Sequence, residues 1–227
     1  MRPVLRAPLS SVRACAQALY AFREAARLRG DDRELLGHCA LAALDVGLFE
    51  EALYHAGRAL ALGGTPLPQV SSLVAQAVAK DLKASDGTKT RRLLEKAHVL
   101  LEDYCAAAPT SAVHWEARLH LEQHCGGAGG AAAGAAGVKR TLRLQLAAYR
   151  NHAPWTSDAA TLGAVVEVAA QLVEALLDKG DAAHVQAARK MVDGLLYAAS
   201  EKLAASPGCE SLRMLQSRIK RHDDDDD

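Results

Sequence analysis

The amino-acid sequence predicts an all-α protein, and three observations carry that prediction. Half of the 227 residues are hydrophobic but only 4% are aromatic, and alanine is abundant, a composition that favours close-packed helices over sheets. No run of β-branched residues alternates with polar ones, so no strand is predicted. Apolar residues instead recur at spacings of three and four, most clearly between Arg33 and Gly64.

The segment 33–64 predicts two short helices joined by a turn at residues 45–47. The first helix presents one apolar face, which consists of Leu36, Cys39, Ala40, Ala43 and Leu44. Gly47 ends that helix, and the second directs an apolar set inward: Phe49, Ala52, Leu53, Ala56, Ala59 and Leu60. The small residues in both sets would let two antiparallel helices approach closely.

This helix pair resembles the tetratricopeptide repeat (TPR) family, and the residues that carry the resemblance are Leu36, Ala40, Ala43, Gly47, Phe49, Ala52 and Ala59. The resemblance implies a right-handed α-solenoid of antiparallel helix pairs. It also implies a non-catalytic scaffold that holds other protein subunits of a complex in its groove. The concave positions are then Glu34, Gly37, His38 and Leu41 on helix 33–45, and Ser71, Ser72 and Ala75 on helix 69–82. A groove lined by such residues suits an extended or helical segment of a permanent partner.

The N-terminal residues allow two interpretations. Residues 1–23 contain arginines and serines but no acid, as in an organellar transit peptide. The favoured interpretation is a repeat helix over 9–29, because Ala18, Phe22 and Ala25 precede Ala52, Ala56 and Ala59 by 34 residues, the period of the family. Further apolar residues spread beyond the inward set, so this helix is expected to expose an interface that includes Leu9, Val12, Leu19 and Tyr20.

The chain continues with predicted helices at 69–82 and 90–107, separated by a polar loop at 83–89. A second internal likeness pairs Tyr104 and Pro109 with Tyr149 and Pro154, each 45 residues later. This 45-residue spacing is longer than the 34-residue period of the family. The difference is attributed to Gly126 to Gly137, which is predicted to be a flexible inserted linker.

The domain organisation follows from that interpretation. TPR-like repeats over 1–125 precede the Gly/Ala-rich linker 126–137, and further repeats with a capping helix occupy 138–222 before an acidic tail at 223–227. Helices are predicted at 158–179, 182–205 and 210–221, and the whole chain should form about ten helices.

An RNA-contacting accessory subunit is the alternative function. The paired Tyr/Pro spacing is similar to that in the TPR subunit of the superkiller RNA-decay complex, which implies a role in RNA processing or decay. The basic residues that could contact RNA are Lys89, Arg91, Arg92, Lys139, Arg140 and Arg143. No aromatic residues are interleaved with them for base stacking, so a solvated helix face is the preferred interpretation.

No catalytic, cofactor or metal site is predicted. His120 and His124 have the i, i+4 spacing of metal ligands, with His114 and Cys125 nearby, but Glu122 is one position away from the HExxH pattern. The five cysteines form no CxxC motif, which favours a reducing compartment, cytoplasmic or nuclear. Five of the 27 acids form the terminal run, so the rest of the chain carries 27 basic and 22 acidic residues and is only mildly basic. No apolar run of membrane-spanning length is recognised.

Overall fold

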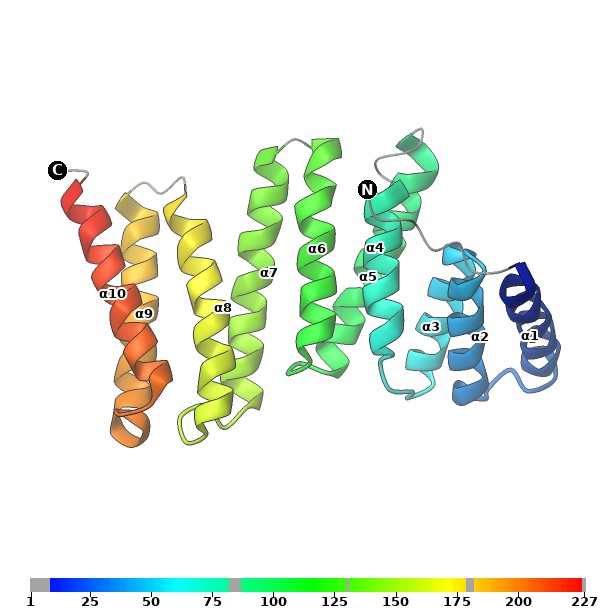
Figure 1. The fold of residues 1–227 in the computed structure, drawn as a ribbon, viewed down its shortest axis with the longest axis horizontal. Coiled ribbons are helices and arrows are strands. Elements are labelled where there is room, and N and C mark those ends of the chain that lie inside the picture. Colours follow the sequence, from blue (N-terminus) through cyan, green and yellow to red (C-terminus); the bar gives the residue numbers. More distant parts are fainter. Residues whose placement is uncertain (1–8, 82–86, 130, 179–181, 226–227) are drawn as a thin grey trace. The chain divides into compact units, whose positions relative to one another are not determined.

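The computed structural model describes residues 9–81, 87–129, 131–178 and 182–225, with side chains placed over 14–76, 92–123, 134–178, 182–200 and 203–222. Ten helices and no strand occupy these ranges, so the all-α prediction is confirmed (Figure 1). The chain divides into two compact units, residues 1–125 and 126–227.

The first unit contains six helices that pack on their neighbours in the chain. Their bounds are α1 Leu9–Leu28, α2 Arg33–Asp45, α3 Phe49–Ala61, α4 Pro68–Asp81, α5 Gly87–Ala107 and α6 Ala112–Gly129, the last of which runs past the division into the second unit. Helix α2 packs against α1, α3 and α4, and α5 packs against both α3 and α4. Arg23 of α1 also forms a two-pronged ion pair with Glu51 of α3, and this guanidinium lowers the pKa of the Glu51 carboxyl.

Helices α2 and α3 have the bounds that the sequence indicates, and local chemistry explains why. The Asp32 carboxylate accepts hydrogen bonds from the backbone N–H groups of Glu34 and Leu35, which caps the start of α2. Gly47 and Gly63 follow α2 and α3 with φ of 79° and 77°, a left-handed conformation in which side chains with a Cβ are strained. Each helix therefore stops where a glycine permits the chain to turn.

The core of the first unit contains most of the small and branched residues that the helical spacing turns inward. Ala40, Ala43, Ala52 and Ala56 are fully buried between α2 and α3, which allows the close approach of the two helices. The larger members of this core are Leu36, Leu53, Val70, Val74, Leu93, Leu94, Leu100, Leu101, Tyr104 and Leu121.

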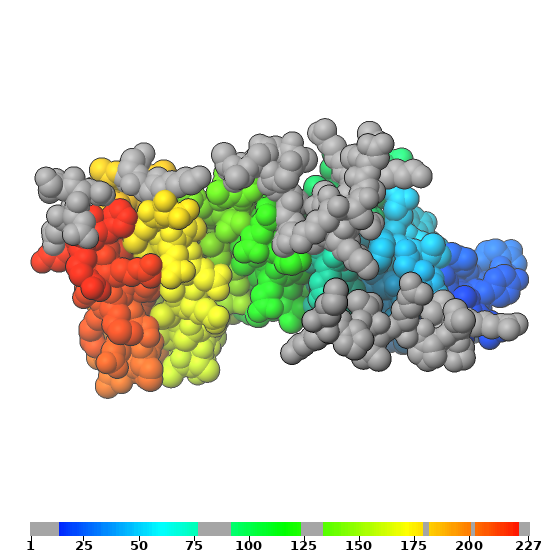
Figure 2. Space-filling view, turned by 45° about the horizontal axis from the view of Figure 1, so that its top comes forward, coloured from blue at the N-terminus to red at the C-terminus, as the bar shows by residue number. Residues whose placement is uncertain are grey.

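The second unit contains four helices around α8. Their bounds are α7 Ala131–His152, α8 Ala159–Leu177, α9 Ala182–Leu203 and α10 Pro207–Asp225. Helix α8 packs against α7, α9 and α10, and α9 also packs against α10. In Figure 2 the surfaces of α8, α9 and α10 form adjacent bands from yellow to red. Asp158 caps α8 by accepting a hydrogen bond from the backbone N–H of Thr161 at 2.8 Å.

Helix α8 is the one helix among the described residues that is long and apolar enough to cross a membrane by length and composition. It has 19 residues, and the mean hydropathy of an 18-residue window within it is 1.6. The expectation that no segment of this length exists was therefore wrong. Half of this stretch is buried, and its apolar residues, such as Val165, Leu172 and Leu176, pack inside the second unit. A core helix of a soluble protein has the same character.

The segment 126–137 differs from the prediction of a flexible linker. Residues 126–129 form the end of α6 and residues 131–137 form the start of α7, while residue 130 lies outside the described residues. The physical reason is that half of the segment is alanine, the strongest helix former, whose propensity offsets the cost of the interspersed glycines. Of the predicted acidic tail, Asp223 to Asp225 continue α10.

Candidate protein-binding surface

One group of predicted concave residues does line a single hollow. Glu34, Gly37, His38 and Leu41 of α2 border a space of about 470 Å³, which the loop after α3 closes with Gly63, Gly64, Thr65 and Leu67. Arg33 donates from Nη1 to the Gly63 carbonyl oxygen at 3.1 Å, and the His38 ring stacks on Phe22 with centroids 5.5 Å apart. Gly37 is itself buried, whereas Glu34 and His38 are exposed.

In the other group of predicted concave residues, Ser72 is half-buried and the other two are not on the surface. Ser71 and Ala75 are buried in the first unit, and placing them in an accessible groove was wrong. The Ser71 hydroxyl lies 2.7 Å from Nδ1 of His114, which is also buried. This hydrogen bond between α4 and α6 supplies the partner that a buried hydroxyl requires.

Of the residues predicted to form an interface on α1, Tyr20 is on the surface and Leu19 is not. Tyr20 is 67% exposed, but Leu19 is only 2% exposed and belongs to the core of the first unit. Leu19 therefore cannot contribute to an accessible face, because it packs into the core, whereas Ala18, Phe22 and Ala25 of the predicted inward set are only half-buried. The side chains of Leu9 and Val12 lie outside those that the structure describes.

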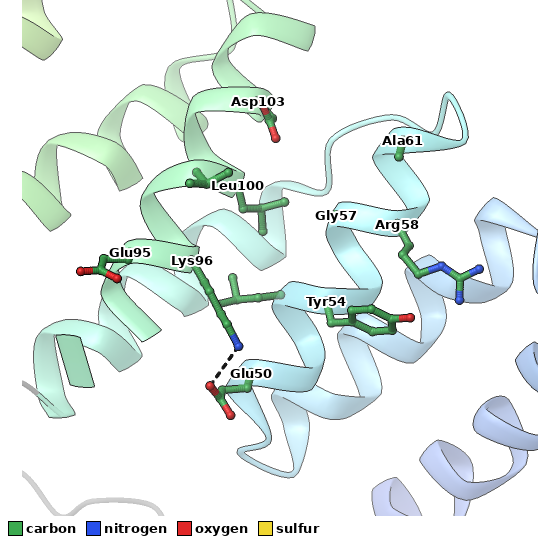
Figure 3. A pocket seen from close by; sticks show the side chains of 11 residues that line it. Glu50, Tyr54, Gly57, Arg58, Ala61, Glu95, Lys96, Leu100 and Asp103 are labelled. Atoms are coloured by element: carbon green, nitrogen blue, oxygen red, sulfur yellow. Dashed lines mark hydrogen bonds and ion pairs between the residues drawn. The ribbon is translucent and has the colours of Figure 1, made fainter. Parts of the chain in front are cut away.

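A larger apolar hollow, which the sequence analysis missed, lies between α3 and α5. It has a volume of about 550 Å³, and Figure 3 shows its two walls, with Glu50, Tyr54 and Gly57 on α3 and Lys96 and Leu100 on α5. We call it the α3/α5 groove; its residues are Glu50, Leu53, Tyr54, Gly57, Arg58, Ala61, Glu95, Lys96, Val99, Leu100 and Asp103. A signal did exist in the sequence, since Tyr54 and Val99 are large apolar residues outside the inward stripes of their helices.

The α3/α5 groove has a buried floor and exposed apolar edges. Leu53 and Leu100 form the floor and are each 5% exposed, whereas Tyr54 and Val99 are 58% and 61% exposed. Gly57 places no side chain over Leu100, whose Cδ1 lies 3.9 Å from where a Cβ at position 57 would be. Apolar surface of this depth and continuity is typical of a binding groove.

The two cations of the groove are both engaged with other residues of the chain. Lys96 Nζ lies 3.1 Å from Glu50 Oε1, an ion pair visible in Figure 3. Arg58 donates from Nη2 to the Gly30 carbonyl oxygen at 2.8 Å, and its guanidinium lies 5.8 Å from the centroid of the Tyr54 ring. Asp103 makes no hydrogen bond or ion pair with any other residue that the structure describes.

The polar residues singled out in the sequence do not form a metal-binding group in the described part of the chain. No group of three or more His, Cys, Asp or Glu side chains lies within metal-binding reach there. His114 is held by Ser71, and the side chains of His124 and Cys125 are outside the described set. Burial raises the pKa of the Cys105 thiol to about 12, which makes it a poor nucleophile at neutral pH.

The basic residues considered for RNA contact fall in both units. Arg140 and Arg143 of α7 are exposed and Lys139 is half-buried. Arg92 of α5 is exposed, whereas the side chains of Lys89 and Arg91 lie outside the described residues.

No protein-family model matches this chain, and no curated protein matches it either.

Proposed function

We propose that this protein is a non-catalytic, TPR-like helical scaffold that binds other proteins in a multi-subunit assembly. The right-handed superhelical arrangement of the TPR family is part of this proposal. Consecutive helices that pack as neighbours support it, because such stacking leaves elongated grooves between successive helices on the surface.

The observation that carries the proposal is the α3/α5 groove. Two large apolar side chains, Tyr54 and Val99, stand exposed beside a floor formed by Leu53 and Leu100. An isolated surface leucine or valine is ordinary, but a continuous apolar groove with an exposed tyrosine has the composition of a protein-binding hot spot.

Quantitative affinity capture from a native extract tests the proposal. The test bait is this chain with Tyr54→Ser and Val99→Glu combined. The wild-type chain and a Tyr197→Ser variant are used as comparison baits. Tyr197 of α9 is 86% exposed and lines none of the hollows described above, so it controls for the loss of a surface tyrosine. We expect specific proteins to bind the wild type and the Tyr197 variant and to be depleted by more than about tenfold on the groove variant.

The proposal is wrong if the wild type and the groove variant, both folded by circular dichroism, retain the same proteins in the same amounts. The two substituted side chains are mostly exposed, so their replacement should cost little stability and the comparison remains interpretable.

A further inference from the structure

We propose that the occupant of the α3/α5 groove is an amphipathic α-helix of a partner protein, with basic residues flanking its apolar stripe. This inference rests on the proposed scaffold function and specifies its partner. Two properties of the groove support it: the periodicity of its walls and the distribution of its charges.

Each wall of the groove is a helical stripe. The α3 wall consists of residues spaced i, i+3, i+4, i+7, i+8 and i+11: Glu50, Leu53, Tyr54, Gly57, Arg58 and Ala61. The α5 wall has the same kind of spacing, with Glu95, Lys96, Val99, Leu100 and Asp103. Side chains three and four apart form the ridges into which a third helix packs. Neither wall is a sheet edge, so an extended peptide would find no row of backbone groups to pair with.

The length and floor of the groove also fit a helix. The α3 wall spans eleven helical steps, roughly 16 Å, which corresponds to about three turns of a bound helix. Gly57 and Ala61 are small, so the backbone of an incoming helix can approach α3 closely. Tyr54 and Val99 on the two walls then cover the flanks of its apolar stripe.

The charges favour a basic partner. Glu50, Glu95 and Asp103 line the groove together with only two cations, Lys96 and Arg58. Lys96 is paired with Glu50, and Arg58 is directed to the Gly30 carbonyl oxygen. Both cations are therefore held by the protein itself, whereas the Asp103 carboxylate is exposed and bonds to no other described residue. A lysine or arginine beside the apolar stripe of the partner would pair with this acid, and an acidic flank would be repelled.

Three designed peptides of about 14 residues, about 21 Å long as helices, test the inference. The first carries a leucine stripe at helical spacing with flanking lysines, and the second has the same stripe with flanking glutamates. The third has the composition of the first in an order that destroys the stripe. At low salt we expect the first peptide to bind the full chain at least about tenfold more tightly than either of the others. At high salt the difference in affinity between the first and second peptides should be smaller.

Variants of the full chain locate the binding and test the role of charge. Val99→Glu should lower the affinity for the lysine peptide by more than about tenfold, since it places a carboxylate in the apolar contact. Asp103→Lys should weaken binding of the lysine peptide about three- to tenfold, and Lys96→Gln, which removes a cation from the groove, should tighten it a few-fold. The controls are Tyr197→Glu on α9 and Glu116→Lys on α6, which change exposed residues outside the groove and should leave the affinity unchanged.

The inference is overturned if the glutamate or scrambled peptide binds as tightly as the lysine peptide, or if Val99→Glu leaves the affinity intact. It is also overturned if light scattering shows self-association that Val99→Glu abolishes, because the occupant would then be a second copy of this chain. Suppose that the Tyr54/Val99 variant loses the captured proteins but the wild type prefers the glutamate peptide. That result would reject a basic helix as the occupant and retain the scaffold function. Unchanged capture would reject the scaffold function whatever the peptides do.

Discussion

At the scale of single residues, the glycines of the second unit fall into two groups that the sequence does not distinguish: those with free space around them and one that is closely packed. Gly163 and Gly194 lie inside α8 and α9, and nothing stands within 4 Å of where their Cβ atoms would be. Gly208 lies in the first turn of α10, where a Cβ would meet Leu162 Cγ at 2.8 Å and Cδ2 at 2.9 Å. The first two glycines are therefore replaceable, and the third is required by the packing of α10 on α8.

This difference predicts opposite effects of the same substitution. Gly163→Ala should raise the free energy of unfolding by about 0.5–1 kcal/mol, because alanine restricts the unfolded chain and favours the helix. Gly208→Ala should lower it by about 1–3 kcal/mol, because the fully buried Leu162 would have to shift to admit the new Cβ. Urea denaturation monitored by the fluorescence of Trp155, in the same unit, measures both changes. Gly194→Ala serves as a second stabilising control, and stabilisation by Gly208→Ala would show that α10 does not pack on Leu162 as described.

At the scale of helices, the sequence predicts the elements well and their surroundings less well. The bounds of α2 and the core faces of α2 and α3 follow from local spacing and from Gly47, which acts within a few residues. The exposure of Ser71 does not follow from spacing, because a hydroxyl can be buried once a distant residue such as His114 offers a hydrogen bond. Likewise, the groove depends on the pairing of α3 with α5, which brings Tyr54 and Val99 together across 45 residues of chain.

The burial of His114 predicts how the stability of the first unit depends on pH. Burial lowers the pKa of His114 below its ordinary value near 6.5, so the unfolded chain binds this proton more readily than the folded one. The contribution to stability is therefore present above about pH 6.5 and declines as the pH falls below that value. Its slope cannot exceed about 1.4 kcal/mol per pH unit, the limit for one proton.

Urea denaturation between about pH 7.5 and pH 5.5, followed by Trp115 fluorescence, measures this dependence. We expect His114→Gln to be less stable than the wild type at neutral pH but to lose less stability on acidification. Equal slopes for the wild type and His114→Gln would mean that His114 does not titrate differently on unfolding. Ser71→Ala should cost about 1–3 kcal/mol at neutral pH, since it leaves the buried imidazole without its partner.

At the scale of the whole molecule, each compact unit has its own core and its own tryptophan, whose fluorescence can report the unfolding of that unit. The chain has two tryptophans, one in each unit. The indole of Trp115 donates to the carbonyl oxygen of Pro109 at 2.9 Å, and that of Trp155 donates to the carbonyl oxygen of Arg150 at 3.2 Å. Both rings are buried, so the fluorescence of each should change when its own unit unfolds.

These reporters allow a test of whether the units behave as separate cooperative bodies. In a Trp155→Phe background only Trp115 reports, and in a Trp115→Phe background only Trp155 reports. Leu101 and Leu176 are buried in the first and second unit, and replacing either with alanine should cost about 2–5 kcal/mol through lost burial and the cavity left behind. Because contacts in stacked-helix proteins are mostly between neighbours, the loss should fall chiefly on the unit that contains the cavity. We therefore expect Leu176→Ala to lower the urea midpoint reported by Trp155 far more than the one reported by Trp115, and Leu101→Ala to do the reverse. Equal shifts of both midpoints by either substitution would show that the chain unfolds as one cooperative body.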